Sequence, residues 1–148
     1  MEALLTAIIV WLSTSYGLPA SFNHPRVEFV SATEMIGFLE AEIGVKQRND
    51  IASTTSGSEI LSLYNYESQT IYLRDGWNGK TPAELSLLVH EMVHHLQNVG
   101  QLKFACPEER EELAYKAQDR WLGLFGHDLA RDFDLDPFTI LVKSKCLL

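Results

Sequence analysis

Basic residues are scarce in this chain, and their scarcity excludes two classes of partner. Lysine and arginine number 12 against 20 aspartate and glutamate residues, which gives a formal net charge of −8. A protein that binds nucleic acid needs a clustered basic surface to neutralise phosphates, and an anionic membrane surface makes a similar demand. Here the few basic residues are scattered along the chain. We therefore expect no nucleic-acid partner and no binding to an anionic membrane.

Long hydrophobic runs are also missing. The most apolar stretch, residues 3–12, is too short to cross a bilayer, which takes about 20 residues, so we expect no integral membrane segment. The stretch has the length of a signal-peptide core, but a secretory leader begins with positive charge, whereas this one begins with Glu2 and carries no Lys or Arg. Its apolar residues recur at helical spacing, which favours a buried first helix instead: Leu4, Ile8, Trp11 and Leu12.

Cysteine is rare as well, with two residues in the chain, and this excludes a disulfide-rich scaffold. Cys106 and Cys146 can form one bridge that ties the C-terminal tail to the segment before a late helix; the alternative is two buried free thiols. A bridge would favour an oxidising compartment, periplasmic or extracellular, whereas free thiols would favour the cytoplasm.

The composition is that of an ordinary folded protein, with 46% hydrophobic and 22% charged residues. At 148 residues, without a repeat, a low-complexity stretch or a linker, the chain is predicted to form a single domain over residues 1–148.

Periodicity and turn residues predict the elements of this domain. After the first helix we expect a strand at 24–31, a helix at 32–44, an exposed loop at 46–58, a β-hairpin at 60–73 and a loop at 74–80. Two long helices follow, at about 81–98 and 107–123, and then a turn of helix and an extended tail. This order predicts an α+β fold, in which helices and a hairpin or small sheet pack on the two long helices.

The first of the two long helices has clear end signals. Thr81 is a favourable N-cap, Pro82 suits the first helical position, and Glu84 completes a capping box by reaching back to the Thr81 backbone. Gly100 should end the helix shortly after Asn98.

The same helix contains the sequence HEMVH, residues 90–94, which matches the H-E-x-x-H pattern. Residues four apart lie one above the other on a helix, so His90 and His94 can bind one ion from the same side. Zn²⁺ suits a pair of neutral imidazoles. Glu91 is turned about 100° from His90, where it can take a proton from a metal-activated water without occupying the coordination sphere.

Two further polar residues of this helix are predicted to have lesser roles. His95 is turned about 100° away from His94 and cannot share its ion. It could pair with Glu91, but a partly exposed surface position is the expectation. Gln97 returns to the stripe of His90, where it either lines the site or packs at the edge of the core.

A catalytic zinc needs a third protein ligand. The metzincin pattern requires a glycine and a histidine at the positions of Gln97 and Gly100, so that arrangement is excluded. The next helix offers four glutamates, Glu108, Glu109, Glu111 and Glu112.

Helical geometry chooses among these glutamates. The apolar residues of the helix form an arc centred near Ala114: Leu113, Ala114, Ala117, Trp121, Leu122 and Leu124. Glu111 lies roughly 60° from that centre and inside the arc. Glu108 lies at its edge, and Glu109 and Glu112 point to solvent. A core-facing acid needs a counter-charge, which zinc would supply, so Glu111 is the predicted third ligand.

At HEMVH and the later EELA, residues 111–114, the chain resembles the gluzincin metallopeptidases. Its short length and the hairpin before the motif helix resemble the minimal gluzincins, and the stretches HHLQ and AYKAQDRWL resemble small bacterial putative-peptidase domains. The resemblance covers residues 81–122. It implies a zincin-like fold, a third ligand in a Glu-x-x-Ala setting, and a later Tyr or His that donates to the transition state, for which Tyr115 and His127 are the candidates. It also implies that the strand before the motif helix, residues 69–73, forms the cleft edge that pairs with an extended peptide.

The sequence therefore predicts a zinc-dependent metallopeptidase that hydrolyses peptide or protein substrates, with Glu91 as general base. One alternative is a catalytically inactive, zinc-binding regulatory or interaction domain, which would be closed by a fourth protein ligand such as Cys106. Another is a hydrolase of a non-peptide amide with the same chemistry.

Overall fold

Four strands form a mixed sheet in the order β1-β4-β3-β2. The computed structural model describes residues 1–20, 23–44, 51–56 and 59–146. The strands are β1 (Arg26–Val30), β2 (Ile51–Ser56), β3 (Glu59–Asn65) and β4 (Thr70–Arg74), and the helices are α1 (Glu2–Tyr16), α2 (Ala32–Gly44), α3 (Pro82–Val99), α4 (Glu109–Gly123), α5 (Leu129–Phe133) and α6 (Pro137–Lys143). The predicted α+β class is confirmed.

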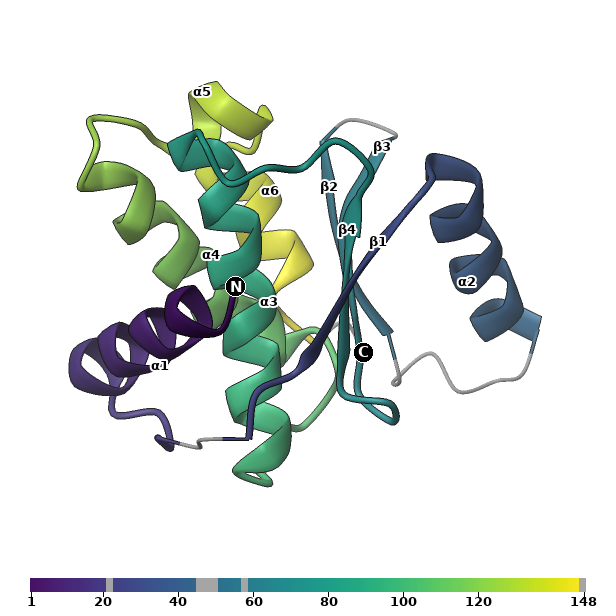
Figure 1. Ribbon diagram of the computed structural model, residues 1–148, viewed down its shortest axis with the longest axis horizontal. Helices are drawn as coiled ribbons and strands as arrows, with labels where there is room; N and C mark the ends of the chain where they lie inside the picture. The colour runs from purple at the N-terminus through teal and green to yellow at the C-terminus, as the bar shows by residue number, and fades with distance from the viewer. Residues whose placement is uncertain (21–22, 45–50, 57–58, 147–148) are drawn as a thin grey trace.

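The sheet lies between two unequal helical layers (Figure 1). Helix α2 covers one face and α3 packs against the other, and α1, α4, α5 and α6 lie on the same side of the sheet as α3. Strand β1 pairs in parallel with β4, whereas β2, β3 and β4 are antiparallel neighbours. The predicted hairpin is confirmed: β3 and β4 pair from Ser62 with Leu73 to Asn65 with Thr70.

Side chains of β3 and β4 alternate between the two faces, as the period of a strand requires. Leu63 joins a small apolar cluster with Met35 of α2, whereas Tyr64 and Ile71 join the main core against α3. Helix α1 adds Leu5, Ile8, Ile9 and Leu12 to that core. The prediction of a buried first helix is thus confirmed, although Leu4 and Trp11 are only partly buried.

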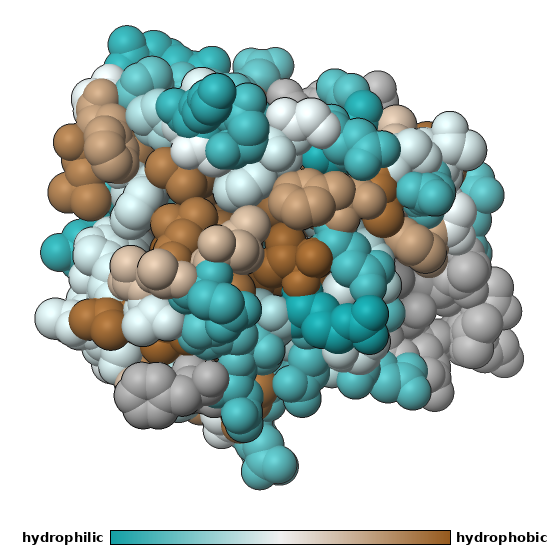
Figure 2. Space-filling model, viewed as in Figure 1, coloured by the Kyte–Doolittle hydropathy of each residue, from teal (hydrophilic) through white to brown (hydrophobic). Residues whose placement is uncertain are grey.

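Hydrophobic residues reach the surface in the middle of the face drawn in Figure 2, over the region of α1, α3 and β1, with hydrophilic residues around them. Val10 of α1 and Phe29 of β1 are among the exposed large apolar residues. Within the residues that the structure describes, no helix is long and apolar enough to cross a membrane.

Three predictions about elements are wrong. Residues 51–56 of the expected loop form strand β2; the rest of that loop lies outside the described residues. The segment after α4 forms two short helices, α5 and α6, in place of a turn of helix and an extended tail. Strand β4 cannot be the free edge that was expected at residues 69–73, because it is hydrogen-bonded to β1 on one side and to β3 on the other.

Helix α3 begins as predicted. The Thr81 hydroxyl accepts from the Glu84 amide, and Pro82 occupies the first turn. The Glu84 carboxylate accepts from the Lys80 amide in place of the expected Thr81 amide. At the C-terminal end of α3, residue 100 has room only for glycine, because a Cβ there would lie 2.5 Å from Cγ of Pro19.

The predicted Cys106–Cys146 disulfide is present. Its Cα atoms are 5.8 Å apart and it closes a loop with a sequence separation of 40. Beside it, Lys145 forms an exposed ion pair with Glu112 of α4 at 3.4 Å. The bridge therefore holds the C-terminal helices against the beginning of α4.

Removal of this bridge, in the double variant Cys106→Ser/Cys146→Ser, should lower the free energy of unfolding by about 3–4 kcal/mol. The reason is that the unfolded chain gains the entropy of an open loop of this length. Urea unfolding measures the change, and reduction of the parent protein should reproduce it. A loss below about 1 kcal/mol, or two free thiols in the protein from an oxidising compartment, would contradict this role.

Candidate metal centre

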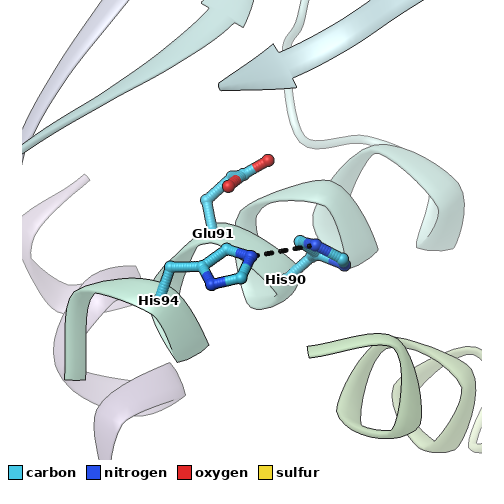
Figure 3. A group of neighbouring side chains, drawn as sticks. All are labelled: His90, Glu91 and His94. Atoms are coloured by element: carbon cyan, nitrogen blue, oxygen red, sulfur yellow. Dashed lines mark hydrogen bonds between the residues drawn. The ribbon is translucent and has the colours of Figure 1, made fainter. Parts of the chain in front are cut away.

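Helix α3 places His90, Glu91 and His94 together in the interior. All three side chains have no exposed surface, and one ligand-capable atom of each lies within 4.8 Å of the others, so that this group could hold a metal ion. The Nε2 atoms of the two histidines lie 3.3 Å apart (Figure 3). The Glu91 carboxylate extends away from the two rings, toward the sheet.

Helix α4 brings Glu111 to the same point. One carboxylate oxygen lies 3.0 Å from Nε2 of His90 and the other 3.1 Å from Nε2 of His94. Ala114, three residues after Glu111, is small and fully buried in the core that also holds residues of α3, which leaves room for the two helices to approach each other. Burial alone would raise the pKa of Glu111, but the two histidines reverse this effect and hold it far below its ordinary value.

The position and protonation of Nδ1 of His90, the ring nitrogen that faces away from Glu111, are fixed by a chain of hydrogen bonds from α4 back to α3. The Gln118 amide donates to the Ser86 hydroxyl at 3.2 Å, and that hydroxyl donates to the Ala83 carbonyl. The Gln118 carbonyl oxygen therefore faces Nδ1 of His90, at 2.8 Å, and can only accept. This assigns the proton of His90 to Nδ1 and leaves the lone pair on Nε2.

His94 is oriented in the same way. The Gln97 amide donates to the Arg110 carbonyl at 3.2 Å, so its carbonyl oxygen accepts from Nδ1 of His94, also at 3.2 Å. The Tyr66 hydroxyl lies 2.8 Å from the same nitrogen, and the Arg110 guanidinium covers the Tyr66 ring at 4.3 Å. Gln97 thus contacts the site, one of the two positions expected for it.

These contacts test whether the residues fit a metal ion. Two imidazole lone pairs and a carboxylate converge on one buried point, an arrangement that requires a positive charge between them. A proton can supply it: burial lowers the pKa of His94, but Glu111, together with Glu91 and Gln97, outweighs burial and raises it. A divalent ion can supply it too, and two neutral nitrogens with one carboxylate oxygen are the donors that zinc takes in catalytic sites. The donor set fits.

Glu91 is held apart from these three donors. The Ser62 hydroxyl of β3 donates to one of its oxygens at 2.5 Å. Burial raises the pKa of Glu91, and the two histidines and Ser62 offset only part of this effect. A carboxylate with a raised pKa beside a metal centre is suited to accept and release a proton near neutral pH.

The remaining predicted residues are placed as follows. Glu108 is exposed at the N-terminus of α4, the Glu109 carboxylate accepts from the Ala105 amide, and Glu112 pairs with Lys145, so none of these three contacts the histidines. Tyr115 packs its ring on His90, with centroids 4.8 Å apart.

His127 lies beyond the end of α4, and Leu124, expected in the apolar arc, is exposed there. Nδ1 of His127 lies 2.9 Å from a carboxylate oxygen of Asp132, within hydrogen-bonding distance. The 12 residues of helix between Glu111 and Gly123 span about 18 Å, and the structure does not bring His127 to the centre.

His95 corrects a prediction, since it is fully buried and is not a surface residue. Its Nε2 donates to the Asn23 carbonyl at 2.7 Å, and its Nδ1 lies 2.9 Å from the Tyr64 hydroxyl. Asn98 in turn donates to that hydroxyl at 3.0 Å. His95 therefore joins α3 to the sheet and to the segment before β1.

Sequence reasoning missed Ser62, Tyr66 and Gln118. Gln118 could have been found, because it lies seven residues after Glu111 and hence on the same face of α4. Ser62 and Tyr66 come from β3 and the turn after it, and nothing local indicates that they meet α3.

The whole chain, residues 1–148, matches a protein family whose description is Domain of unknown function (DUF6647). No curated protein and no solved structure matches the chain.

Replacement of Gln118 by leucine should weaken metal binding by about 10–100-fold, because His90 loses the acceptor that fixes its tautomer. Competition titration with a chromogenic chelator measures the effect. Gln118→Glu, which restores an acceptor, should recover most of the affinity, and Glu112→Gln on the exposed face should change nothing. Equal affinities in Gln118→Leu and the parent would contradict the positioning role.

His95 should keep a neutral imidazole, with its proton on Nε2, to a lower pH than an ordinary histidine, whose pKa is about 6.5. Burial lowers its pKa, and the hydrogen bond to Asn23 only partly opposes this. Long-range ¹H–¹⁵N correlation spectra report both the charge and the tautomer, with His95→Asn to assign the signals. A charged ring, or a proton on Nδ1 alone, would show that the Tyr64–His95–Asn23 assignment is wrong.

Proposed function

The chain belongs over its full length to the family described as Domain of unknown function (DUF6647), and we propose that it is a zinc-dependent metallopeptidase. The observation that carries this proposal is the position of Glu111. Each of its two carboxylate oxygens lies beside Nε2 of one histidine of the H-E-x-x-H motif. Two helices thus bring together the two nitrogens and one carboxylate of a gluzincin-type site.

In this proposal His90, His94 and Glu111 hold the ion, and Glu91 does not. Glu91 is the other buried acid near the histidines, but its carboxylate is hydrogen-bonded to Ser62 of the sheet. A bound zinc ion would polarise a substrate carbonyl and make a water molecule more acidic. Cys106 cannot be a fourth ligand while it is bonded to Cys146, which leaves a position open for substrate or water.

Glu91 moves the proton. Its carboxylate accepts a proton from the attacking water as the oxygen of that water bonds to the scissile carbonyl carbon. It then delivers the proton to the amine nitrogen as the C–N bond breaks. Ser62 orients the carboxylate by donating to one oxygen. Burial, which raises the pKa of Glu91, makes the carboxylate basic enough for this transfer.

Tyr115 is the candidate donor to the developing oxyanion. Its ring rests on His90, and burial and the nearby Glu111 raise its pKa, so that the hydroxyl keeps its proton at neutral pH. His127 is not proposed for this role because it is paired with Asp132 at the far end of α4.

The peptide should bind at the edge strand β2. Within the described part of the chain, β2 pairs with β3 alone, and β3 carries the Ser62 that contacts Glu91. An extended substrate that adds to this edge gains main-chain hydrogen bonds. The disulfide favours an oxidising compartment, so we place the activity in the periplasm or outside the cell.

One observation favours a second candidate function, an inactive metal-binding regulatory or interaction domain. The side chains of His90, Glu91 and His94 have no exposed surface, whereas a catalytic centre must admit its substrate. Assay of the zinc-loaded protein on peptide libraries and on non-peptide amides separates this function, peptide hydrolysis and the hydrolysis of other amides.

Matched glutamate variants test the peptidase proposal. Glu111→Gln should lower zinc affinity by orders of magnitude, because a ligand is lost. Glu91→Gln should keep zinc but lose hydrolysis by about 10²–10⁴-fold, the usual contribution of a general base. Glu112→Gln is the control and should retain both properties.

Chelator competition gives the zinc affinity and peptide-library digestion gives the hydrolysis rate. Loss of zinc in Glu91→Gln but not in Glu111→Gln would reverse the two assignments. A zinc-loaded parent protein that cleaves no peptide would contradict the peptidase proposal, and one that cleaves neither peptides nor other amides would leave the regulatory function.

A further inference from the structure

A groove of about 450 Å³ lies between α4 and the C-terminal helices α5 and α6. Its lining is mainly apolar and includes Tyr115 of α4, Leu129 of α5, Leu135, and Ile140 of α6. The volume falls within the range of about 300–1,000 Å³ that is usual for small-molecule sites, which also combine apolar walls with a few polar groups. The disulfide holds the two sides of the groove together, since Cys146 follows directly on its lining residue Lys145.

Most charged groups on the rim already have partners. Glu112 pairs with Lys145, Asp119 accepts from the Leu129 amide at 3.0 Å, and Asp128 caps α5 and pairs with Arg131. Lys116 differs: it is exposed at the rim, and no ion pair or hydrogen bond of its ammonium is found among the residues that the structure describes. An apolar channel with one uncommitted cation at its mouth complements a molecule that has an apolar body and one negative end.

We propose that this groove is a binding site for a small amphipathic carboxylate. The carboxylate pairs with the Lys116 ammonium, and the apolar chain lies along Leu129, Leu135 and Ile140. The partner is defined by this chemistry: one anionic head on an unbranched or aromatic apolar body. Binding at this site does not depend on the proposed peptidase activity: Tyr115 is the one residue with a proposed catalytic role that lines the groove, and the ligand is held by Lys116, Leu129, Leu135 and Ile140.

The groove and the metal centre share one side chain. The residues of α4 that line the groove point in a direction about 100° around the helix axis from Glu111 and Gln118. Tyr115 lies between these two directions. Its ring both lines the groove and rests on His90. A ligand that contacts Tyr115 therefore alters the surroundings of His90, and occupancy can be read at the metal centre without an activity assay.

Decanoate, used below its micelle concentration, is the probe, and decanol and decyltrimethylammonium are the matched neutral and cationic ligands. Titration calorimetry gives the affinities of the parent, Lys116→Met and the control Lys80→Met, in which an exposed lysine of the loop before α3 loses its charge. Decanoate should bind about tenfold more tightly than decanol, and Lys116→Met should abolish that difference. Lys80→Met should bind like the parent. NMR spectra should show shifts at Tyr115 and His90 on addition of decanoate, and none at His24 near α1.

Three results would overturn the site. Decanoate could fail to bind at millimolar concentration, it could bind Lys116→Met as tightly as Lys80→Met, or the ammonium ligand could bind as tightly as the carboxylate. Shifts at His24 as large as those at Tyr115 would likewise show a nonspecific association.

Discussion

Two imidazole nitrogens and one carboxylate converge between α3 and α4. The surrounding structure holds these polar groups out of water, although burial costs them their hydration. Polar groups without exposed surface are costly unless their hydrogen-bonding atoms are satisfied. Each outer histidine nitrogen is therefore held by a glutamine whose own amide is fixed, Gln118 through Ser86 and Gln97 through the Arg110 backbone. The two inner nitrogens, Nε2 of His90 and Nε2 of His94, face Glu111, and a positive charge between them, carried by a proton or a metal ion, would balance the carboxylate.

The rest of the fold keeps the two helices in register. On one side, Tyr64 and Ser62 of β3 contact His95 and Glu91, so that α3 is anchored to the sheet through the residues that flank the stripe of His90 and His94. On the other side, the disulfide holds the start of α4, where Glu111 lies, against the C-terminal helices. Ala114 and Ala117 of α4 are fully buried in the core that includes α3, and larger side chains there would have to displace α4 and Glu111 with it.

Local chemistry explains which features were predictable. Capping residues and helical spacing defined α3 and placed His90 and His94 on one face. The apolar arc of α4 turned Glu111 toward that face, although its role as a ligand stays a prediction. The failures came from tertiary contacts that no local pattern contains. His95 looked like a surplus polar residue because its partners, Tyr64 and the Asn23 carbonyl, come from distant segments. Strand β2 is a polar, turn-like sequence that becomes a strand by pairing with β3. The segment after α4 forms helices capped by Asp128 and Asp136, signals that were present but short.

The claim on which the account depends is that the convergent atoms are metal ligands. The most direct measurement is an anomalous-difference map at the zinc edge, from crystals of the protein loaded with zinc. The account predicts one peak about 2.0–2.2 Å from Nε2 of His90, Nε2 of His94 and a carboxylate oxygen of Glu111, with Glu91 outside the coordination sphere. A peak bound by Glu91 in place of Glu111, or no peak between α3 and α4 in zinc-saturated crystals, would contradict it.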